Sequence, residues 1–215
     1  MLALAVGFKL WPVLIFPIFL RRLTIQKWKL ILNGIVFSLV VIIIFIPVLL
    51  AGYDENQGFM KYATNWINNA AFYTLLKDGI ELFTTTFKIY YVCADCVARW
   101  IVGGIVFITL LFLIRKPAKN NLDITDKILM IIAISFLISP TQFPWYLTWM
   151  ILTLVFSPKV SLLMYAFLIP LYHLNPLSGY FIYIQHIPVI LLFIYEIKKG
   201  AGFGYFNRSQ LLNEN

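Results

Sequence analysis

The chain has 215 residues, of which 61% are hydrophobic and 12% are charged, and it carries a net charge of +8. Soluble domains average about 45–50% apolar and about 25% charged residues, so this excess is too large for one globular core and predicts a lipid environment. Twelve of the 17 basic residues fall in short segments between apolar runs, which argues against a nucleic-acid-binding face and is typical of cytoplasmic membrane loops.

Seven apolar runs predict an all-α fold, a polytopic transmembrane helical bundle. They cover residues 2–20, 30–51, 97–114, 127–139, 145–157, 160–173 and 182–197. The first three runs and the last approach the ~20 residues that cross a ~30 Å hydrocarbon core. The middle three are shorter, so they are either short tilted spans or, for the fourth and fifth runs, a re-entrant hairpin. One transmembrane domain is therefore expected over residues 1–200.

Four groups of basic residues predict the orientation of the bundle in the plasma membrane. They are residues 21–29, residues 115–127, Lys159 and residues 198–208. Positive charge is enriched in cytoplasmic loops, so these groups are expected inside. The N-terminus, a long loop over 52–96 and the turn at 140–144 then lie outside, and residues 201–215 form a cytoplasmic tail.

Lys9 lies in the middle of the first apolar run, where a cation is energetically costly. Such a cation normally faces a cavity, a partner or a phosphate; the alternative is that its amine reaches the lipid–water interface. Pro12 and Pro17 in the same run are expected to bend the helix beside it.

Residues 59–72 are too polar to span and have the periodicity of an amphipathic helix on the outer interface. Apolar side chains recur there at helical spacing, whereas Lys61, Asn65 and Asn68 share the opposite face. A helix of this kind can cover a cavity between spans.

Cys93 and Cys96 form one C-x-x-C motif. A structural zinc site has four ligands, and the two histidines, His173 and His186, lie far along the chain, so no metal site is expected. Two alternatives remain: a local disulfide on an oxidising side of the membrane, and two inert cysteines at the interface. The inert pair is the preferred interpretation.

The segment from Pro140 to Pro144 is the most distinctive part of the sequence. Two prolines four residues apart make a rigid turn between spans, so its backbone polar groups need water or a ligand. Gln142, Trp145 and Tyr146 are expected to face outward from this turn, and an indole beside an amide and a phenol suits a sugar ring. The alternative is an aromatic belt at the membrane surface.

Two further pairs of polar residues lie near the expected outer surface. His173 and His186 bracket the last outer turn, where either imidazole could contact a phosphate or move a proton; the alternative is a hydrated side chain at a helix end. Asp95 and Arg99 are spaced four residues apart, which favours a helical ion pair over a phosphate contact.

Three stretches together resemble one family. They are Lys9-Leu10-Trp11-Pro12 with the following Pro17 and Arg21-Arg22, residues 62–72 with Trp66 and Asn69, and Ser139-Pro140-Thr141-Gln142-Phe143-Pro144-Trp145-Tyr146-Leu147-Thr148-Trp149. The pattern is similar to the C-terminal half of bacterial and archaeal C-type glycosyltransferases, especially the polyprenol-phosphate-mannose-dependent mannosyltransferases of family 87. The proline-framed run is the most specific element.

The resemblance implies an integral membrane hexosyltransferase. It would take a sugar from a polyprenyl-phosphate donor on the outer face and transfer it to a lipid or glycan acceptor of the cell envelope. No cofactor is implied, although the chemistry allows a divalent cation. The candidate substrate-binding residues are Lys9, Asn65, Trp66, Gln142, Trp145, Tyr146, His173 and His186.

The chain departs from this family at the catalytic carboxylate, which in such enzymes lies on the first outer loop. Asp54 and Glu55 do not occupy a matching position, so no catalytic residue is assigned. We therefore expect a C-terminal portion that an N-terminal half or a partner subunit completes. The alternatives are a non-enzymatic transporter or flippase for lipid-linked sugars, and a structural membrane subunit.

Overall fold

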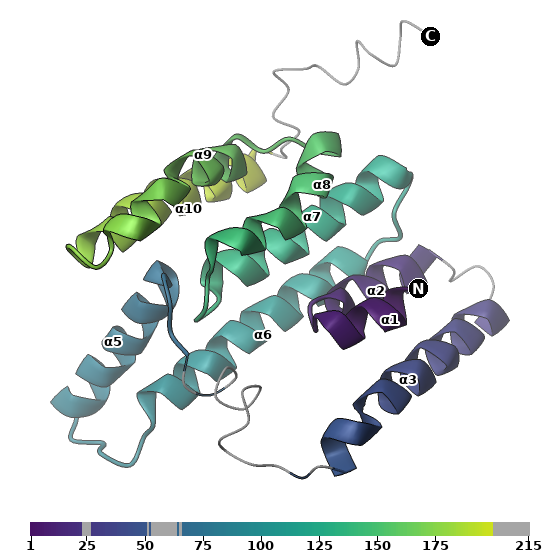
Figure 1. Cartoon of the computed structure of the whole chain (residues 1–215), viewed down its shortest axis with the longest axis horizontal. Helices are drawn as coiled ribbons and strands as arrows, with labels where there is room; N and C mark the ends of the chain where they lie inside the picture. Colours follow the sequence, from purple (N-terminus) through teal and green to yellow (C-terminus); the bar gives the residue numbers. More distant parts are fainter. Residues whose placement is uncertain (23–26, 51, 53–63, 65, 200–215) are drawn as a thin grey trace, which may run out of the picture. The chain divides into compact units, whose positions relative to one another are not determined.

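The computed structural model describes residues 1–22, 27–50, 52, 64 and 66–199 (Figure 1). The elements in this part of the chain are helices, and β-structure is represented there by a single isolated bridge between Asn68 and Thr141. The chain divides into two compact units. The first unit comprises Met1–Trp66 and Gly104–Ile132, and the second comprises Ile67–Gly103 and Ala133–Asn215.

The first apolar run forms two helices, α1 (Leu2–Phe8) and α2 (Pro12–Arg22), instead of the expected single span. The backbone leaves the helix at Lys9, which is extended with φ −153° and ψ 136°. Pro12 then stands at the first position of α2, where its missing N–H costs no helical hydrogen bond. The expectation of a bent but continuous helix was wrong, because Pro12 begins a helix here.

The helix α3 (Lys27–Leu50) is the longest described element of the first unit and packs against α1. Gly7 permits this approach, since a Cβ atom on Gly7 would stand 3.0 Å from the Cγ2 atom of Ile44. The rings of Phe16 and Phe37 stack with their centroids 3.6 Å apart, which joins α2 to α3.

The C-terminal end of α6 (Ala94–Ile114) is also held within the first unit. The Nε atom of Arg21 donates to the carbonyl oxygen of Ile114 at 2.9 Å, and its Nη2 atom donates to that of Arg115 at 3.5 Å. The last carbonyls of a helix have no intrahelical donor, so the guanidinium satisfies them. The basic group at residues 21–29 therefore contacts the basic group at residues 115–127 within this unit. The next helix along the chain is α7 (Asn121–Ile138).

In the second unit, the amphipathic helix is α5 (Ala71–Thr86), which begins later than expected. Residues 59–63 and 65 of the expected helix lie outside the described residues. Residues 66–70 are not helical, because Asn68 pairs with Thr141 and Asn69 adopts a positive φ of 50°. The prediction of a helix over 59–72 was therefore wrong for residues 66–70, whereas residues 71 and 72 are helical.

Five helical elements complete the second unit after α7. They are the 3-10 helix η1 (Pro144–Leu147), α8 (Thr148–Phe156), α9 (Val160–Leu168), the 3-10 helix η2 (Ile169–Leu174) and α10 (Tyr180–Lys198). The helices α9 and α10 lie side by side (Figure 1). Leu162, Tyr165 and Val189 are fully buried between the elements of this unit. Burial of such side chains contributes roughly 1.5–3 kcal/mol each for aliphatic residues.

Glu196 closes the N-terminal end of α9 from the neighbouring helix. Its carboxylate accepts a hydrogen bond from the backbone N–H of Val160 at 2.8 Å, and another from the hydroxyl of Ser161. Glu196 is 1% exposed. An acidic group at a helix N-terminus accepts hydrogen bonds from unpaired N–H groups and is attracted by the positive end of the helix dipole. Glu196 therefore links α10 to α9.

Three helices in the described part of the chain are long and apolar enough to cross a membrane, namely α3, α6 and α10. This is compatible with a membrane protein. Shorter apolar helical segments cover Pro12–Arg21, Pro144–Phe156 and Val160–Leu174. The fold is thus all-α as predicted, whereas the prediction of about seven spans is not confirmed.

Candidate functional site

The proline-framed turn is paired through its backbone with the segment that precedes α5. The N–H of Asn68 donates to the carbonyl of Pro140 at 2.9 Å, and the N–H of Gln142 donates to the carbonyl of Asn68 at 2.8 Å. The side chain of Asn68 also donates to the carbonyl of Gln142 at 3.0 Å. The backbone groups of the turn that were expected to need water or a ligand are satisfied in part by this pairing.

Gln142 holds the inside of the turn. Its side chain is fully buried, at 0% exposure, and its Nε2 atom donates to the carbonyls of Leu137 at 3.1 Å and Ser139 at 3.3 Å. Its Oε1 atom lies 2.7 Å from the Nε2 atom of His186. The expectation that Gln142 faces outward was wrong, because its amide is engaged on both sides by protein groups.

His186 lies between two carbonyl acceptors. Its Nδ1 atom is 2.8 Å from the carbonyl of Ile182, and its Nε2 atom faces Oε1 of Gln142. The two carbonyls that receive the Gln142 amide N–H groups fix which end of that amide points to the imidazole. A neutral imidazole has one N–H, so it donates to one of these two oxygens at a time. His186 is fully buried, so the alternative of a hydrated side chain at a helix end was wrong.

Several buried polar atoms beside this pair have no hydrogen-bond partner among the described residues. They include both amide atoms of Gln185 and the hydroxyl of Tyr165, whose ring centroid lies 5.4 Å from that of His186. The amide of Asn175 donates to Oδ1 of Asn69 at 3.0 Å, while Asn69 Nδ2 and Asn175 Oδ1 have no such partner. Buried polar groups are normally paired, so these atoms are exceptions in the interior of the second unit.

The aromatic side chains of the turn are arranged in two stacks. The ring of Phe143 lies 4.4 Å from that of Trp145 with an angle of 7° between the planes, and Tyr146 lies 4.2 Å from Trp149 at 23°. Trp145 is 57% exposed, whereas Tyr146 is 8% exposed. Of the three residues predicted to face outward from the turn, Trp145 does so, and Tyr146 and Gln142 are buried.

The remaining predicted contacts are dispersed. His173 is exposed on η2, where its ring packs edge-on against Tyr172 with the centroids 5.3 Å apart. Lys9 and Trp66 are exposed residues of the first unit, and Asn65 lies outside the described residues. The gathering of Lys9 and Trp66 with the proline-framed turn stays a prediction.

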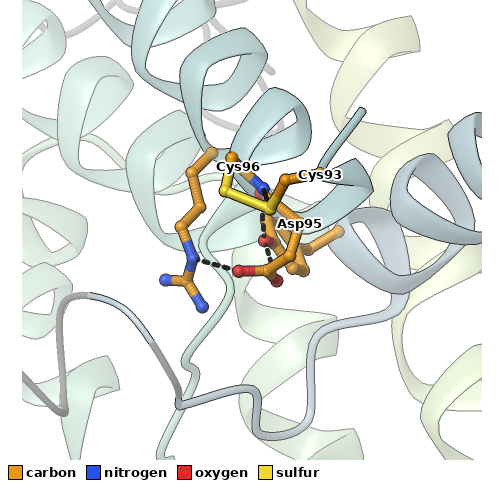
Figure 2. The surroundings of a disulfide bond; sticks show 5 residues. Cys93, Asp95 and Cys96 are labelled. Atoms are coloured by element: carbon orange, nitrogen blue, oxygen red, sulfur yellow. Dashed lines mark hydrogen bonds and ion pairs between the residues drawn. A yellow bond between two sulfur atoms is a disulfide. The ribbon is translucent and has the colours of Figure 1, made fainter. Parts of the chain in front are cut away.

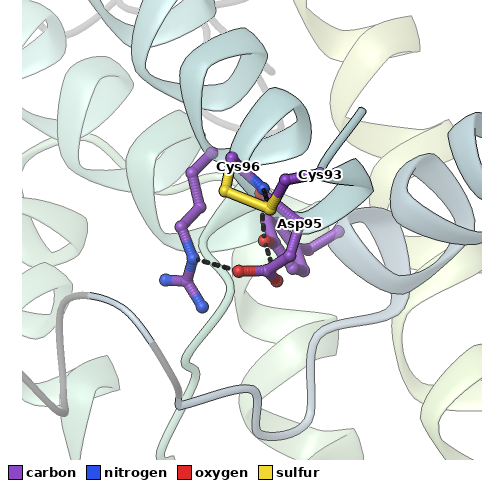
Figure 3. Close-up of polar contacts among 5 residues, drawn as sticks. Cys93, Asp95 and Cys96 are labelled. Atoms are coloured by element: carbon purple, nitrogen blue, oxygen red, sulfur yellow. Dashed lines mark hydrogen bonds and ion pairs between the residues drawn. A yellow bond between two sulfur atoms is a disulfide. The ribbon is translucent and has the colours of Figure 1, made fainter. Parts of the chain in front are cut away.

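A second polar cluster, which the sequence indicated only in part, joins α5 to the start of α6. Tyr73 is fully buried, and its hydroxyl donates to Oδ1 of Asp95 at 2.6 Å. Oδ2 of Asp95 accepts from the Nε atom of Arg99 at 2.8 Å, which confirms the predicted ion pair (Figure 3). Burial, and then the hydrogen bond to Asp95, raise the pKa of Tyr73 above its ordinary value. Tyr73 was missed because its partner lies 22 residues away, beyond any local periodicity.

Cys93 and Cys96 are joined by a disulfide bond at the edge of this cluster (Figure 2). The preferred interpretation of an inert pair was therefore wrong, and the alternative of a local disulfide holds. Within the described residues, no group of three or more histidine, cysteine or acidic side chains could hold a metal ion.

An apolar pocket of about 470 Å³ lies between α5 and the segment that leads into α6. Its lining includes Leu76, Gly79, Ile80, Phe83 and Val97. The pocket and the buried polar cluster around His186 belong to the same unit. The second unit therefore presents a polar interior and an apolar pocket of a size that suits small ligands.

The structure thus assembles a buried amide–imidazole pair, an exposed indole beside it in the sequence, and an apolar pocket on α5. No protein-family model, no curated protein and no solved structure matches the chain.

Proposed function

We propose that the chain is a membrane-bound hexosyltransferase component that binds a sugar carried on polyprenyl phosphate for transfer to a cell-envelope lipid or glycan. The observation that carries the proposal is the buried hydrogen bond between Gln142 and His186. It fixes the turn whose sequence resembles the mannosyltransferases, and it leaves Trp145 as the exposed aromatic residue of that turn.

Trp145 supplies the surface that a sugar ring needs. One side of its indole is covered by the stacked ring of Phe143, while more than half of its surface is exposed. A pyranose ring offers apolar C–H faces and polar hydroxyl edges, so it combines stacking on an indole with hydrogen bonds to amides. The unpartnered amide atoms of Gln185 and Asn175 are candidate partners in this unit for the hydroxyl groups of the sugar.

The isoprenoid part of the donor requires an apolar surface. The pocket on α5 is lined almost entirely by aliphatic and aromatic side chains, so it can accept hydrocarbon. Lys9 lies in the break between α1 and α2 of the first unit, and a contact between its amine and a donor phosphate stays a prediction from the sequence.

The proposal is tested with the whole chain reconstituted in lipid nanodiscs. Binding is measured for polyprenyl-phosphate-mannose, polyprenyl phosphate and a polyprenol without phosphate. We expect the sugar-bearing lipid to bind at least about tenfold more tightly than the unglycosylated phosphate, a difference of ~1.4 kcal/mol. Equal binding of both phosphates would contradict recognition of the sugar.

A second assay separates transfer from transport. Radiolabelled donor is supplied with a mixture of envelope glycolipids, and both the label on the acceptor and the sidedness of the intact donor in vesicles are followed. Transfer to the acceptor supports the enzyme. Movement of intact donor across the bilayer without cleavage would favour the transporter or flippase, and neither activity together with no binding would favour a structural subunit.

A further inference from the structure

The Cys93–Cys96 disulfide lies at the first turn of α6, with both cysteines exposed. The Cα atoms are 5.2 Å apart and the cysteines are three positions apart in the sequence. The backbone N–H of Cys96 points at the Sγ atom of Cys93, 3.1 Å away (Figure 2). Cys93 is thus an exposed residue whose sulfur already receives a backbone hydrogen bond.

This bond contributes little as a cross-link. The entropy that a disulfide removes from the unfolded chain grows with the length of the loop it closes, and this loop is among the shortest that a disulfide can close. The two cysteines are also joined by the helix itself, since the N–H of Val97 donates to the carbonyl of Cys93 at 3.0 Å. The contact between α5 and α6 is made by Tyr73 and Asp95, without the cysteines.

The same surroundings favour the reduced form. The N-terminal end of a helix carries a positive partial charge and free N–H groups, and both stabilise a thiolate at that position. Cys93 directly precedes α6, so its thiolate would be stabilised by the N–H of Cys96. Asp95 is the nearest acidic group in the sequence, and its charge is balanced by the ion pair with Arg99.

We propose that Cys93–Cys96 is a thiol–disulfide exchange site whose reaction partner is a dithiol. A thiolate of the dithiol attacks one sulfur, the S–S bond breaks and the other cysteine leaves as a thiolate. The second thiol of the partner then attacks the mixed disulfide. Two electrons pass to this chain, both cysteines end as thiols after proton uptake, and the partner ends as a disulfide. The inference does not depend on sugar transfer.

The test compares the disulfide of the folded chain with that of the unfolded chain. The whole chain in nanodiscs is equilibrated with mixtures of reduced and oxidised dithiothreitol, quenched with acid, and labelled with a maleimide–polyethylene glycol under denaturing conditions. A gel then separates the unlabelled and doubly labelled forms, because the chain contains two cysteines. The same titration is run on the chain unfolded in denaturant, and a double variant with Cys93→Ser and Cys96→Ser establishes the unlabelled position.

We expect the equilibrium constant for reduction to be at least tenfold larger in the folded chain, because the fold stabilises the Cys93 thiolate. An equal or smaller constant in the folded chain would overturn the proposal, since the fold would then favour the disulfide. A failure to reduce the folded chain except in denaturant would overturn it as well.

Discussion

Oε1 of Gln142 and Nε2 of His186 lie 2.7 Å apart, and this contact joins two segments that are 44 residues apart in the sequence. Each partner is anchored a second time, Gln142 to the carbonyls that end α7 and His186 to the carbonyl of Ile182 within α10. The turn between α7 and α8 is therefore fixed to α10 by a buried polar contact.

Loss of either partner should destabilise the second unit. Gln142→Ala leaves a buried imidazole N–H without an acceptor and two carbonyls without a donor, so we expect a loss of about 1–3 kcal/mol. His186→Phe should cost a similar amount, because the Gln142 oxygen then lacks its donor. Thermal unfolding in nanodiscs measures both losses.

A double-mutant cycle assigns this cost to the contact. Replacing both partners with apolar groups removes both the imidazole N–H and the amide oxygen of this contact, so Gln142→Leu with His186→Phe should lose less than the sum of Gln142→Leu alone and His186→Phe alone. Asn33→Ala is the control, because the Asn33 side chain donates to a carbonyl of its own helix on an exposed surface. Strict additivity of the two single losses would argue that the contact is energetically unimportant.

Trp145 should decide recognition of the sugar. Trp145→Ala removes the exposed indole and is expected to weaken binding of the sugar-bearing lipid about tenfold, while binding of polyprenyl phosphate changes little. Trp145→Phe retains an aromatic face and should recover part of the loss. Trp100→Ala is the matched control, since Trp100 is an exposed tryptophan of α6 in the same unit. An equal effect of Trp145→Ala on both lipids would place the indole against the membrane.

The positions of most helices follow from the spacing of apolar residues. The runs over 30–51, 97–114 and 182–197 correspond to α3, α6 and α10, because a long apolar run in lipid must satisfy its backbone within a helix. The break at Lys9 could not be read from the sequence, since a proline is compatible with both a kink and a helix start.

The candidate site was less accessible to sequence analysis than the helices. Gln142 and His186 could be selected from the sequence as candidate site residues, because polar side chains next to apolar runs are uncommon. Their burial could not, since it depends on the long-range contact between them. The same holds for Tyr73, an ordinary residue of an amphipathic helix until its partner Asp95 is placed.

Glu196 should stabilise the pairing of α9 and α10. Glu196→Ala leaves the N–H of Val160 and the buried hydroxyl of Ser161 without their acceptor, so we expect a loss of about 1–3 kcal/mol in thermal unfolding. Glu196→Gln keeps one carbonyl oxygen and should lose less. Glu81→Ala, at an exposed acidic residue of α5, provides the control. A loss in Glu81→Ala as large as that in Glu196→Ala would rule out the capping explanation.

The raised pKa of Tyr73 predicts that the folded chain loses stability at alkaline pH. Its pKa is raised in the folded chain, so the folded state keeps the phenol protonated at a pH where the unfolded state ionises. The stabilisation is complete below the ordinary tyrosine pKa of about 10 and is lost as the pH rises through the higher folded value. Stability should therefore fall above about pH 10 in the wild-type chain.

Tyr73→Phe isolates this effect. The variant lacks the ionisable hydroxyl and its hydrogen bond to Asp95, so it should be less stable than the wild-type chain by ~1 kcal/mol near neutral pH. Its stability should also decline less steeply above about pH 10. Tyr90→Phe, at an exposed tyrosine, should leave both properties unchanged. Identical alkaline profiles for Tyr73→Phe and the wild-type chain would contradict the buried role of the phenol.

Gly79 is a position at which a larger side chain can fill the apolar pocket without displacing the residues that line it. A Cβ atom built on Gly79 meets no atom within 4 Å, so Gly79→Leu places a side chain in open space on the pocket surface. Replacing a glycine inside a helix also favours the helix by up to about 1 kcal/mol, so the variant should fold at least as well as the wild-type chain. If the pocket holds the isoprenoid chain, Gly79→Leu should weaken binding of both polyprenyl phosphates to a similar extent.

Gly103→Leu is the control, because Gly103 also has open space around it but lies on α6 outside the pocket. Unchanged lipid binding in Gly79→Leu would show that the hydrocarbon lies elsewhere, and it would leave the sugar contact at Trp145 to be judged independently.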